Sequence, residues 1–392
     1  MHDVPTFRLS AFYFAYFAYV GAFSPYFALY LESIGMSPAR IGTLFAAMQV
    51  MRVVAPNLWA ALADRIGRRA PLVRLGLALA LVAWGGVFLS TDFGVLIAVL
   101  GALAFFTTAA LPLAESLTFA HLRDDLARYG PIRVWGSVGF IAAVMGVGEL
   151  LDRAPLASLL WVVAALLLAS LVCGSLVGDV RSGAAHAGAG SIVPVLRRKE
   201  VLALFGAAFL MCVAHGPLYT FFSIYLADHG YSKAAIGGFW SLGVVAEIAV
   251  FLGMPRLARR WDLRTIFAFS FACAVVRFLM IGWAVDSWPV LALAQLLHAA
   301  TFGSYHAAAL GLVNEHFRDN RRARGQALYM SVSFGAGGML GGIASGFSWD
   351  GIGPALTFSL ASVCAAAGLV LALGTGVRNR RGAQSARDER AH

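Results

Sequence analysis

The stretch Ala63-Asp64-Arg65-Ile66-Gly67-Arg68-Arg69 separates two long apolar runs, 39–62 and 71–90. Gly67 permits a tight reversal of the chain, because glycine has no side chain to obstruct the turn. Asp64 can face a helix end or a neighbouring arginine, while the basic residues stay in water. The stretch therefore predicts a short charged turn between two helices that cross a membrane.

The composition of the whole chain excludes an ordinary soluble protein. Of its 392 residues, 60% are apolar and only 13% are charged, whereas a soluble chain is nearer a quarter charged. One or two globular domains could not bury so much apolar surface, so lipid must be the solvent for most of the chain. An enzyme is not expected, because no protease, hydrolase or nucleotide-binding motif is present.

Twelve apolar runs follow one another along the sequence, and each can supply the roughly 20 residues of a membrane-spanning helix. Each run must be helical, because an open strand edge would leave backbone groups unpaired in hydrocarbon. We therefore predict an all-α membrane protein with twelve transmembrane helices. The runs are 10–31, 39–62, 71–90, 94–119, 132–151, 156–178, 201–226, 235–257, 265–285, 289–312, 325–347 and 353–374.

Lysine and arginine residues lie almost entirely in alternate loops, such as 65–69, 197–199 and 318–324, whereas the opposite loops carry acids such as Asp92 and Asp152. The positive-inside rule places both termini in the cytoplasm. The expected location is a bacterial-type inner membrane. The same loops explain the net charge of +10. A nucleic-acid partner is not expected, because no motif of that kind surrounds the basic residues.

A shift of 195 residues relates the two halves of the chain. It aligns 29–42 with 224–237, where seven of fourteen positions are identical, including Gly35 with Gly230 and Ser37 with Ser232. The repeat predicts two pseudo-symmetric six-helix bundles. Their bounds are 1–178 and 201–376, with a cytoplasmic linker at 179–200 and a cytoplasmic tail at 377–392.

Six ionisable residues inside the predicted spans are candidates for a functional site, because a charge there is costly unless it is paired or faces an aqueous cavity. We expect these residues to surround a wet chamber between the two bundles. No metal site is expected, because the four cysteines lie in apolar runs without metal-ligand spacing. The six residues are Arg52, Glu115, Arg133, Glu247, Arg277 and His298.

The loop at 63–69, its degenerate copy at 259–264 and the two parallel six-span repeats resemble the major facilitator superfamily of transporters. In that family the loop locks the cytoplasmic ends of helices. The resemblance implies transport by alternating access, driven by a proton gradient rather than a bound cofactor. It also implies a gating role for Asp64, Arg65, Gly67 and Arg68.

Two charged pairs resemble residues of the lactose permease branch. Glu115 and Arg133, 18 residues apart, match a carboxylate and an arginine that contact the sugar. Arg277 and His298 match the arginine and histidine of the proton-coupling region. That permease has a carboxylate three residues after the histidine, but this chain has Thr301. The proton relay therefore cannot be transferred intact.

The phenylpropionate permease family, which is related to nucleoside and oligosaccharide symporters, is similar over all twelve spans. The similar segments are 129–137, 242–247, 276–277 and 297–306, together with the tyrosine-rich first span. This resemblance implies proton-coupled uptake of a small organic acid, such as an aromatic carboxylate. The expected partners are thus a small-molecule substrate, a proton and the lipid bilayer, and one chain is expected to act as a monomer.

An aromatic carboxylate needs a cation for its anion and an apolar, aromatic wall for its ring. The candidate cations are Arg52, Arg133 and Arg277, and Glu115 accompanies Arg133. Tyr19 and Tyr26, seven residues apart on one helical face, could form the wall, although they could equally be packing residues. The predicted proton-coupling group is Glu247, with Arg277 and His298 as neighbours; His298 is also expected to line the pathway.

Other functions remain open. In sugar or nucleoside symport, Glu115 and Arg133 would bind hydroxyl groups, and a purely structural role for this pair is a further alternative. Drug efflux is disfavoured, because the fifth span lacks the internal proline found in the glycine motif of proton antiporters. A receptor that binds without transporting could also use this fold.

Overall fold

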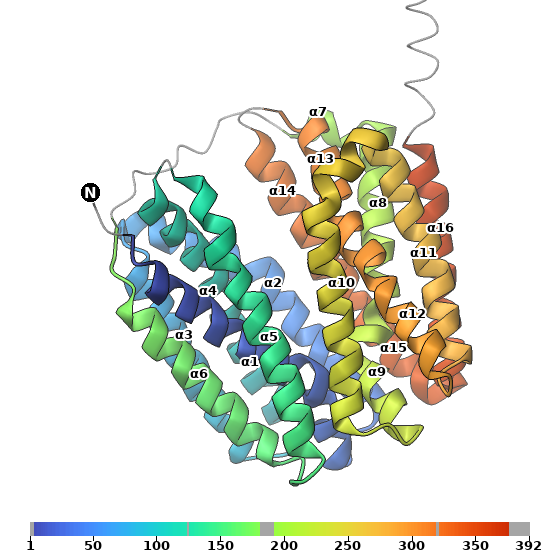
Figure 1. Ribbon diagram of the computed structural model, residues 1–392, viewed down its shortest axis with the longest axis horizontal. Helices are drawn as coiled ribbons and strands as arrows, with labels where there is room; N and C mark the ends of the chain where they lie inside the picture. The colour runs from blue at the N-terminus through green and yellow to red at the C-terminus, as the bar shows by residue number, and fades with distance from the viewer. Residues whose placement is uncertain (1–3, 124, 181–191, 319–320, 376–392) are drawn as a thin grey trace, which may run out of the picture. The chain divides into compact units, whose positions relative to one another are not determined.

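The computed structural model describes residues 4–123, 125–180, 192–318 and 321–375. Within these ranges every regular element is a helix (Figure 1). Eleven helical segments of the described chain are long and apolar enough to cross a membrane. The predicted all-α membrane fold is confirmed. The central part of the predicted linker, 181–191, and the predicted tail, 377–392, lie outside the described residues.

Five of the first six predicted spans each form one long helix, and the third forms α3 followed by the 3-10 turn η1 (Gly86–Phe88). Local sequence signals set several of the helix ends. The Ser37 hydroxyl accepts a hydrogen bond from the Arg40 amide at the start of α2, and Asp92 accepts one from Val95 at the start of α4. Gly67 ends α2 with φ 68°, so the chain reverses at the predicted glycine. The helices are α1 (Thr6–Ser33), α2 (Pro38–Ile66), α3 (Ala70–Gly85), α4 (Phe93–Leu122), α5 (Tyr129–Leu151) and α6 (Ser158–Leu176).

The later spans are more often interrupted. Helices α8 and α9 meet at His215 and form one span, Lys199–Asp228, whereas α14, η5 and α15 together form Arg322–Ile352. The helices are α7 (Val193–Leu196), α8 (Lys199–Ala214), α9 (Gly216–Asp228), α10 (Lys233–Arg260), α11 (Leu263–Trp283), α14 (Arg322–Met330), η5 (Ser331–Gly337), α15 (Gly338–Ile352) and α16 (Pro354–Gly374).

The predicted span 289–312 is not a single α-helix. It consists of α12 (Trp288–Leu296), a π-helical segment η3 (Ala299–Ser304) and α13 (Tyr305–His316). This interruption accounts for the difference between the twelve predicted spans and the eleven long helices. Single π turns inside α-helices are frequent at functional sites, and η3 begins directly after His298.

The internal repeat is visible in backbone geometry. After the first span of each half, Gly35 and Gly230 adopt φ 82° and 78°, which glycine tolerates without strain. The following amides, of Met36 and Tyr231, donate to Leu31 and Leu226 at 3.1 and 3.0 Å. This is the same helix-terminating turn in both halves. Ser232 then caps α10 as Ser37 caps α2.

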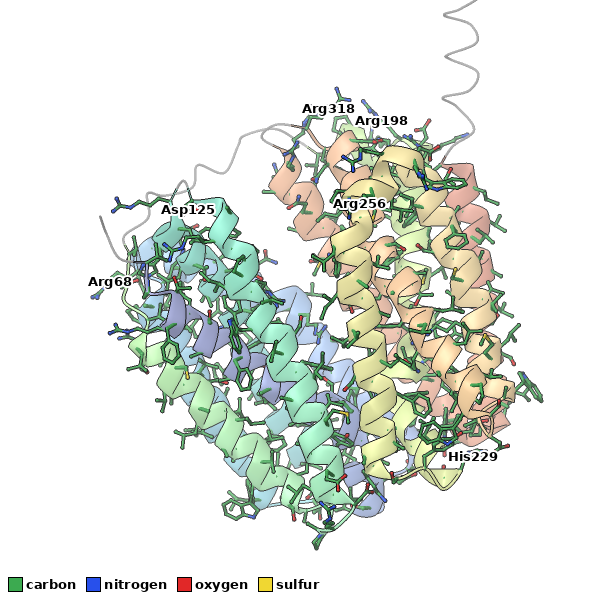
Figure 2. All side chains as sticks on the ribbon, viewed as in Figure 1. Arg68, Asp125, Arg198, His229, Arg256 and Arg318 are labelled. Carbon is green, nitrogen blue, oxygen red and sulfur yellow. The ribbon has the colours of Figure 1, made fainter. Side chains whose placement is uncertain are left out.

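The described chain divides into two compact units. The first joins the described residues up to 180 with Leu218–Ser241 and Gly342–Gly351, and the second contains the rest. These units cut across the predicted division at 178 and 201, which remains a prediction. Figure 2 shows Arg68 and Asp125 at one end of the first unit, and Arg198, Arg256 and Arg318 at one end of the second.

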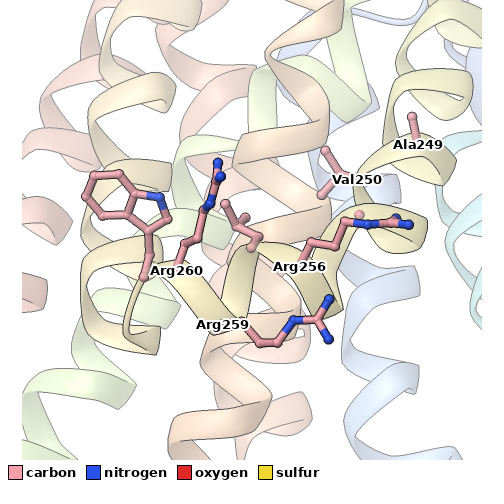
Figure 3. Close-up of a pocket in the computed structure, with 8 residues that line it drawn as sticks. Ala249, Val250, Arg256, Arg259 and Arg260 are labelled. Atoms are coloured by element: carbon pink, nitrogen blue, oxygen red, sulfur yellow. The ribbon is translucent and has the colours of Figure 1, made fainter.

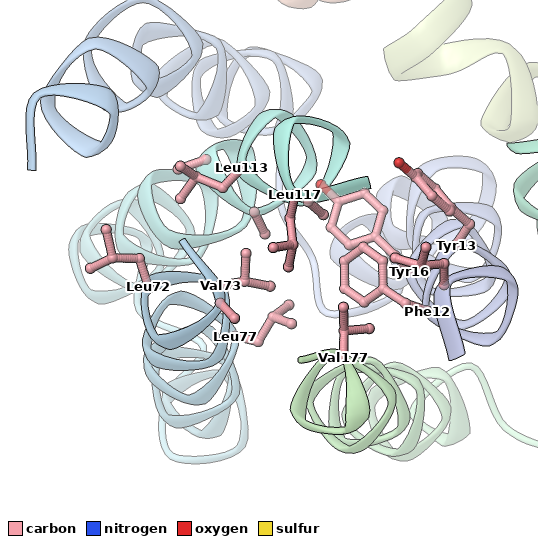
Figure 4. Packing of buried hydrophobic residues seen from close by; sticks show 14 of the residues in the cluster. Phe12, Tyr13, Tyr16, Leu72, Val73, Leu77, Leu113, Leu117 and Val177 are labelled. Atoms are coloured by element: carbon pink, nitrogen blue, oxygen red, sulfur yellow. The ribbon is translucent and has the colours of Figure 1, made fainter. Parts of the chain in front are cut away.

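A buried cluster, mainly from α1, α3 and α4 with members from α2 and α5, lies in the first unit (Figure 4). Phe12, Leu77 and Leu117 belong to it, together with the rings of Tyr13 and Tyr16. The Tyr13 hydroxyl shares a hydrogen bond of 3.0 Å with Thr118, and Tyr16 donates to the Thr107 carbonyl at 3.0 Å. In lipid such a core is held by close packing and hydrogen bonds rather than by transfer from water. It fixes both tyrosine rings in position.

The first unit also contains two equivalent helix contacts, which we call the interlock: α2 on α15 and α10 on α5. Asp350 accepts a hydrogen bond from the Ala39 amide at 3.2 Å, at the start of α2. Asp152 accepts bonds from Lys233 and Ala234 at 2.7 and 2.9 Å, at the start of α10. In both contacts a carboxylate at the end of one helix thus binds the positive N-terminus of another.

Candidate functional site

Arg133 and Glu115, which the sequence predicts as a pair, face each other in the first unit. Arg133 lies near the start of α5 and Glu115 in the last part of α4, with 3.8 Å between Nε and Oε1. Tyr129 donates its hydroxyl to the same carboxylate oxygen at 3.4 Å. Because the two side chains are 30% and 34% exposed, both retain surface that can meet a solute.

Aromatic rings flank the Arg133 guanidinium. Its central carbon lies 4.1 Å from the centroid of the Phe17 ring and 5.6 Å from that of Tyr13. Both rings come from one face of α1, since they are four residues apart. Gly136 makes room for this stack, because a Cβ there would lie 2.8 Å from the Phe17 ring. A cation beside aromatic faces is the combination that an aromatic carboxylate needs.

Tyr19 belongs to the same neighbourhood. Its ring lies 6.2 Å from that of Tyr16, and the Tyr16 ring lies 5.6 Å from the Phe17 ring beside Arg133. Arg52 is exposed and Tyr19 is buried. The structure therefore brings three of the predicted residues of this half together, Glu115, Arg133 and Tyr19, while the role of Arg52 stays a prediction.

Tyr26 lies apart from this group. Its side chain is fully buried, and its hydroxyl contacts the carbonyls of Val144 and Lys233 at 2.7 and 3.1 Å, inside the interlock. These bonds fit the alternative reading of the tyrosines as packing residues. The spacing of seven residues places Tyr26 on the same helical face as Tyr19. Tyr26 nevertheless lies two turns farther along α1, where it contacts Val144 and Lys233 instead of Arg133.

Glu247 and His298 form the centre of a second polar cluster, in the second unit. The His298 Nε2 atom is 3.8 Å from a Glu247 carboxylate oxygen, and the side chains are only 9% and 19% exposed. The Phe302 ring stacks on His298 with a centroid distance of 5.4 Å. Both histidine and carboxylate can exchange a proton, so this pair has the chemistry that proton coupling requires.

Arg277 is completely buried beside this pair. It donates to the Ala294 carbonyl at 2.8 Å, to the Thr301 hydroxyl at 3.0 Å and to the Gln295 side-chain oxygen at 3.3 Å. Thr301 therefore binds the guanidinium from the position where the lactose permease branch carries a carboxylate. Three hydrogen bonds to neutral oxygens thus help to hold the buried guanidinium in place.

Two members of this cluster, Gln295 and His215, do not stand out in the sequence. Gln295 binds Arg277, and the His215 ring lies 6.4 Å from that of His298. Gln295 precedes His298 by three residues on one helical face, which could have revealed it; His215 is in another helix and carries no such signal. Gln295 Nε2 and His298 Nδ1 are buried without hydrogen-bond partners in the described part of the chain.

The loop after α2 is bound by an acid that does not stand out in the sequence. Asp179, just after α6, accepts hydrogen bonds from Arg68 Nε at 2.8 Å and from the amides of Arg69 and Ala70 at 3.2 and 3.1 Å. Asp64 and Arg65 are exposed, and Asp64 forms no ion pair or hydrogen bond within the described residues. In this structure Asp179, and not Asp64, binds an arginine and a helix N-terminus at this loop, while the gating role of Asp64 stays a prediction.

We expect Asp179→Asn to lower the apparent melting temperature in a pH-dependent way. Burial raises the pKa of Asp179, but the Ala70 amide, Arg68 and the Arg69 amide together hold it below its usual value. Because the folded pKa is lowered, the stabilisation is complete above about pH 4 and is lost as the pH falls through that lowered pKa. By analogy with helix caps it should amount to about 1 kcal/mol.

Thermal denaturation of detergent-purified protein checks this result. The difference between wild type and Asp179→Asn should be constant from pH 6 to 8 and should shrink in acid. Asp64→Asn is the matched control in the same loop, and a larger loss there would contradict the assignment.

Comparison with known proteins adds to this geometry. A model of the MFS_1 like family matches residues 6–360. The "Probable 3-phenylpropionic acid transporter" of Escherichia coli (strain K12) is 30% identical over 364 residues, covering 90% of this chain and 93% of the relative. The maltose permease of Geobacillus stearothermophilus is 25% identical, covering 94% of each chain.

Among solved structures, the crystal structure of the nucleoside transporter NupG superposes with a TM-score of 0.83. The alignment covers 94% of this chain and 98% of NupG at 17% identity. At that identity the likeness concerns the fold alone.

Proposed function

The chain belongs to the MFS_1 like family of membrane transporters, and from this membership we propose that it takes up a small aromatic carboxylate together with a proton. It is a multi-pass membrane transporter, not an enzyme. The proposal includes the predicted topology, with both termini in the cytoplasm, and a monomer as the active form. The 30% identity to a probable 3-phenylpropionic acid transporter supports an aromatic acid as substrate.

The observation that carries the substrate class is the environment of Arg133. Its guanidinium meets a carboxylate at 3.8 Å and two aromatic faces at 4.1 and 5.6 Å. A substrate carboxylate would bind the guanidinium in competition with Glu115, and the substrate ring would lie against Phe17 and Tyr13. The same paired charges could bind sugar hydroxyls, which keeps sugar or nucleoside symport as the second candidate.

The proton site in this proposal is Glu247 with His298. A carboxylate anion and a proton that enter together carry no net charge across the membrane. In this proposal the carboxylate binds Arg133, and the proton binds Glu247 or His298. Arg277 supplies a fixed positive charge next to the proton-binding pair, and its hydrogen bonds to Gln295 and Thr301 keep it in place. Coupled transport would then require that binding of the carboxylate at Arg133 changes the proton affinity of the pair Glu247 and His298.

Arg133→Gln should weaken phenylpropionate binding by about 10- to 100-fold. A hydrogen bond to a charged group contributes about 1.5–3 kcal/mol, and each 1.4 kcal/mol is a factor of ten. Binding is measured by the thermal shift of purified protein in a phenylpropionate titration, and uptake by proteoliposomes that contain the same protein.

Arg40→Gln is the matched control, because Arg40 also lies over a phenylalanine ring, 5.5 Å from the Phe93 centroid, but outside this neighbourhood. Maltose and nucleosides are tested alongside phenylpropionate. A sugar that shifts the melting temperature while aromatic acids do not would replace the proposal by the second candidate. Equal binding by wild type and Arg133→Gln would remove Arg133 from the site.

A further inference from the structure

The last turns of α10 form an open groove of about 710 Å³ that the transport proposal does not use (Figure 3). Its lining comes from α10 and from Trp261, the residue that directly follows this helix. Ala249, Val250, Gly253 and Leu257 form an apolar floor, and Arg256, Arg259, Arg260 and Trp261 surround the end of the helix. Figure 3 shows the three arginine side chains fanning out from the helix, with Ala249 and Val250 farther along it.

The positive charge of this groove is not neutralised within the described part of the chain. No carboxylate there lies within ion-pair distance of Arg256, Arg259 or Arg260. The nearest acid in sequence, Asp262, is engaged in capping α11, where it accepts a hydrogen bond from the Thr265 amide at 2.7 Å. The groove is therefore complementary to an anion.

Two general effects explain part of this pattern. Arginines in the last turn of a helix interact favourably with its dipole, and basic loop ends orient membrane proteins. Neither effect requires the apolar floor that extends two turns back along α10. Neither effect requires Trp261, which is 56% exposed. An exposed tryptophan is typical of the boundary between lipid headgroups and acyl chains.

We propose that this groove binds an anionic phospholipid of the surrounding bilayer. The phosphate accepts hydrogen bonds from Arg256 and Arg260, an acyl chain lies along Ala249, Val250 and Gly253, and Trp261 lies at the headgroup level. Guanidinium groups suit phosphate because they present paired donors. A basic pocket on a membrane helix, at the level of the headgroups, is a known arrangement for anionic lipid recognition.

Native mass spectrometry of the full chain tests the proposal with phosphatidylglycerol and phosphatidylcholine as probes. Wild type should retain phosphatidylglycerol in preference to phosphatidylcholine. The double variant Arg256→Gln/Arg260→Gln should bind phosphatidylglycerol about thirtyfold more weakly, since each arginine near a headgroup contributes roughly 1 kcal/mol. Arg197→Gln, an exposed arginine of the same unit outside the groove, is the control for lost charge and should leave binding unchanged.

A second measurement guards against a variant that fails to fold. Phosphatidylglycerol should raise the apparent melting temperature of the wild type more than phosphatidylcholine does, because a ligand of the native state stabilises it. Equal retention of the two lipids, equal binding by the double variant, or loss of binding in Arg197→Gln would each overturn the assignment to this groove.

Discussion

Glu247→Gln is expected to abolish proton-driven accumulation of phenylpropionate in proteoliposomes. Glutamine keeps the size of the side chain but does not titrate, so the pair with His298 at 3.8 Å loses its acid. If one proton accompanies each carboxylate, a pH gradient of one unit supports about tenfold accumulation, or about 1.4 kcal/mol. The variant should reach equal concentrations on both sides and no more.

Two further measurements separate lost coupling from a lost protein. Binding of phenylpropionate should survive, because Arg133 is unchanged. Exchange of labelled for unlabelled substrate should survive too, because it needs no net proton movement. Glu149→Gln is the control, since Glu149 is a carboxylate at the far end of α5 that pairs with Arg153. Accumulation by Glu247→Gln at the wild-type level would reject Glu247 as the proton-coupling group.

A second variant, His298→Gln, decides whether Glu247 or His298 is the proton-coupling group. His298→Gln removes the neighbouring titratable ring but leaves the carboxylate. If Glu247 is the coupling group, His298→Gln should reduce the rate of uptake and still permit accumulation. The buried Arg277 lies next to both, and its hydrogen bonds to Thr301 and Gln295 do not depend on either group.

The fold was largely predictable from the sequence because lipid imposes simple rules on it. Long apolar runs must be helices, and a helix that ends in a left-handed backbone favours glycine at that position. Gly67 and the equivalent pair Gly35 and Gly230 all have positive φ at the end of a helix. The π-helical segment after His298 was not predictable, since its side chains differ little from those of an α-helix in their hydrophobic pattern.

The polar groups of the site were only partly predictable, for a related reason. A charge inside an apolar run is conspicuous, so Glu115, Arg133, Glu247, Arg277 and His298 could be selected, and the structure pairs them within each unit. Neutral partners such as Gln295 are not conspicuous. The contact between Arg68 and Asp179 joins residues 111 apart, and no local pattern links them.

The glycines of the interlock yield the second large prediction: Gly42→Ala and Gly237→Ala should each reduce uptake at least tenfold. At Gly237 an added methyl carbon would lie 2.8 Å from the Val144 carbonyl oxygen and 2.5 Å from the Tyr26 hydroxyl. At Gly42 it would fall against the Gly342 carbonyl and 2.9 Å from the Gly346 Cα. Backbone atoms cannot move aside alone, so whole helices must separate.

Separation of α10 from α5, or of α2 from α15, would break the hydrogen bonds by which Asp152 and Asp350 bind the N-termini of α10 and α2. A transporter that must close this end during its cycle would then stall, although the substrate neighbourhood around Arg133 would be intact. Uptake in proteoliposomes should therefore fall while phenylpropionate binding persists.

Gly238→Ala is the matched control, because Gly238 is adjacent on the same helix and a methyl carbon there would meet nothing within 4 Å. Alanine should even favour that helix by up to about 1 kcal/mol. The comparison isolates the contact from helix propensity, since both substitutions add the same atom to neighbouring positions of α10. If Gly237→Ala transports as well as Gly238→Ala, close helix approach at the interlock is not required for the transport cycle.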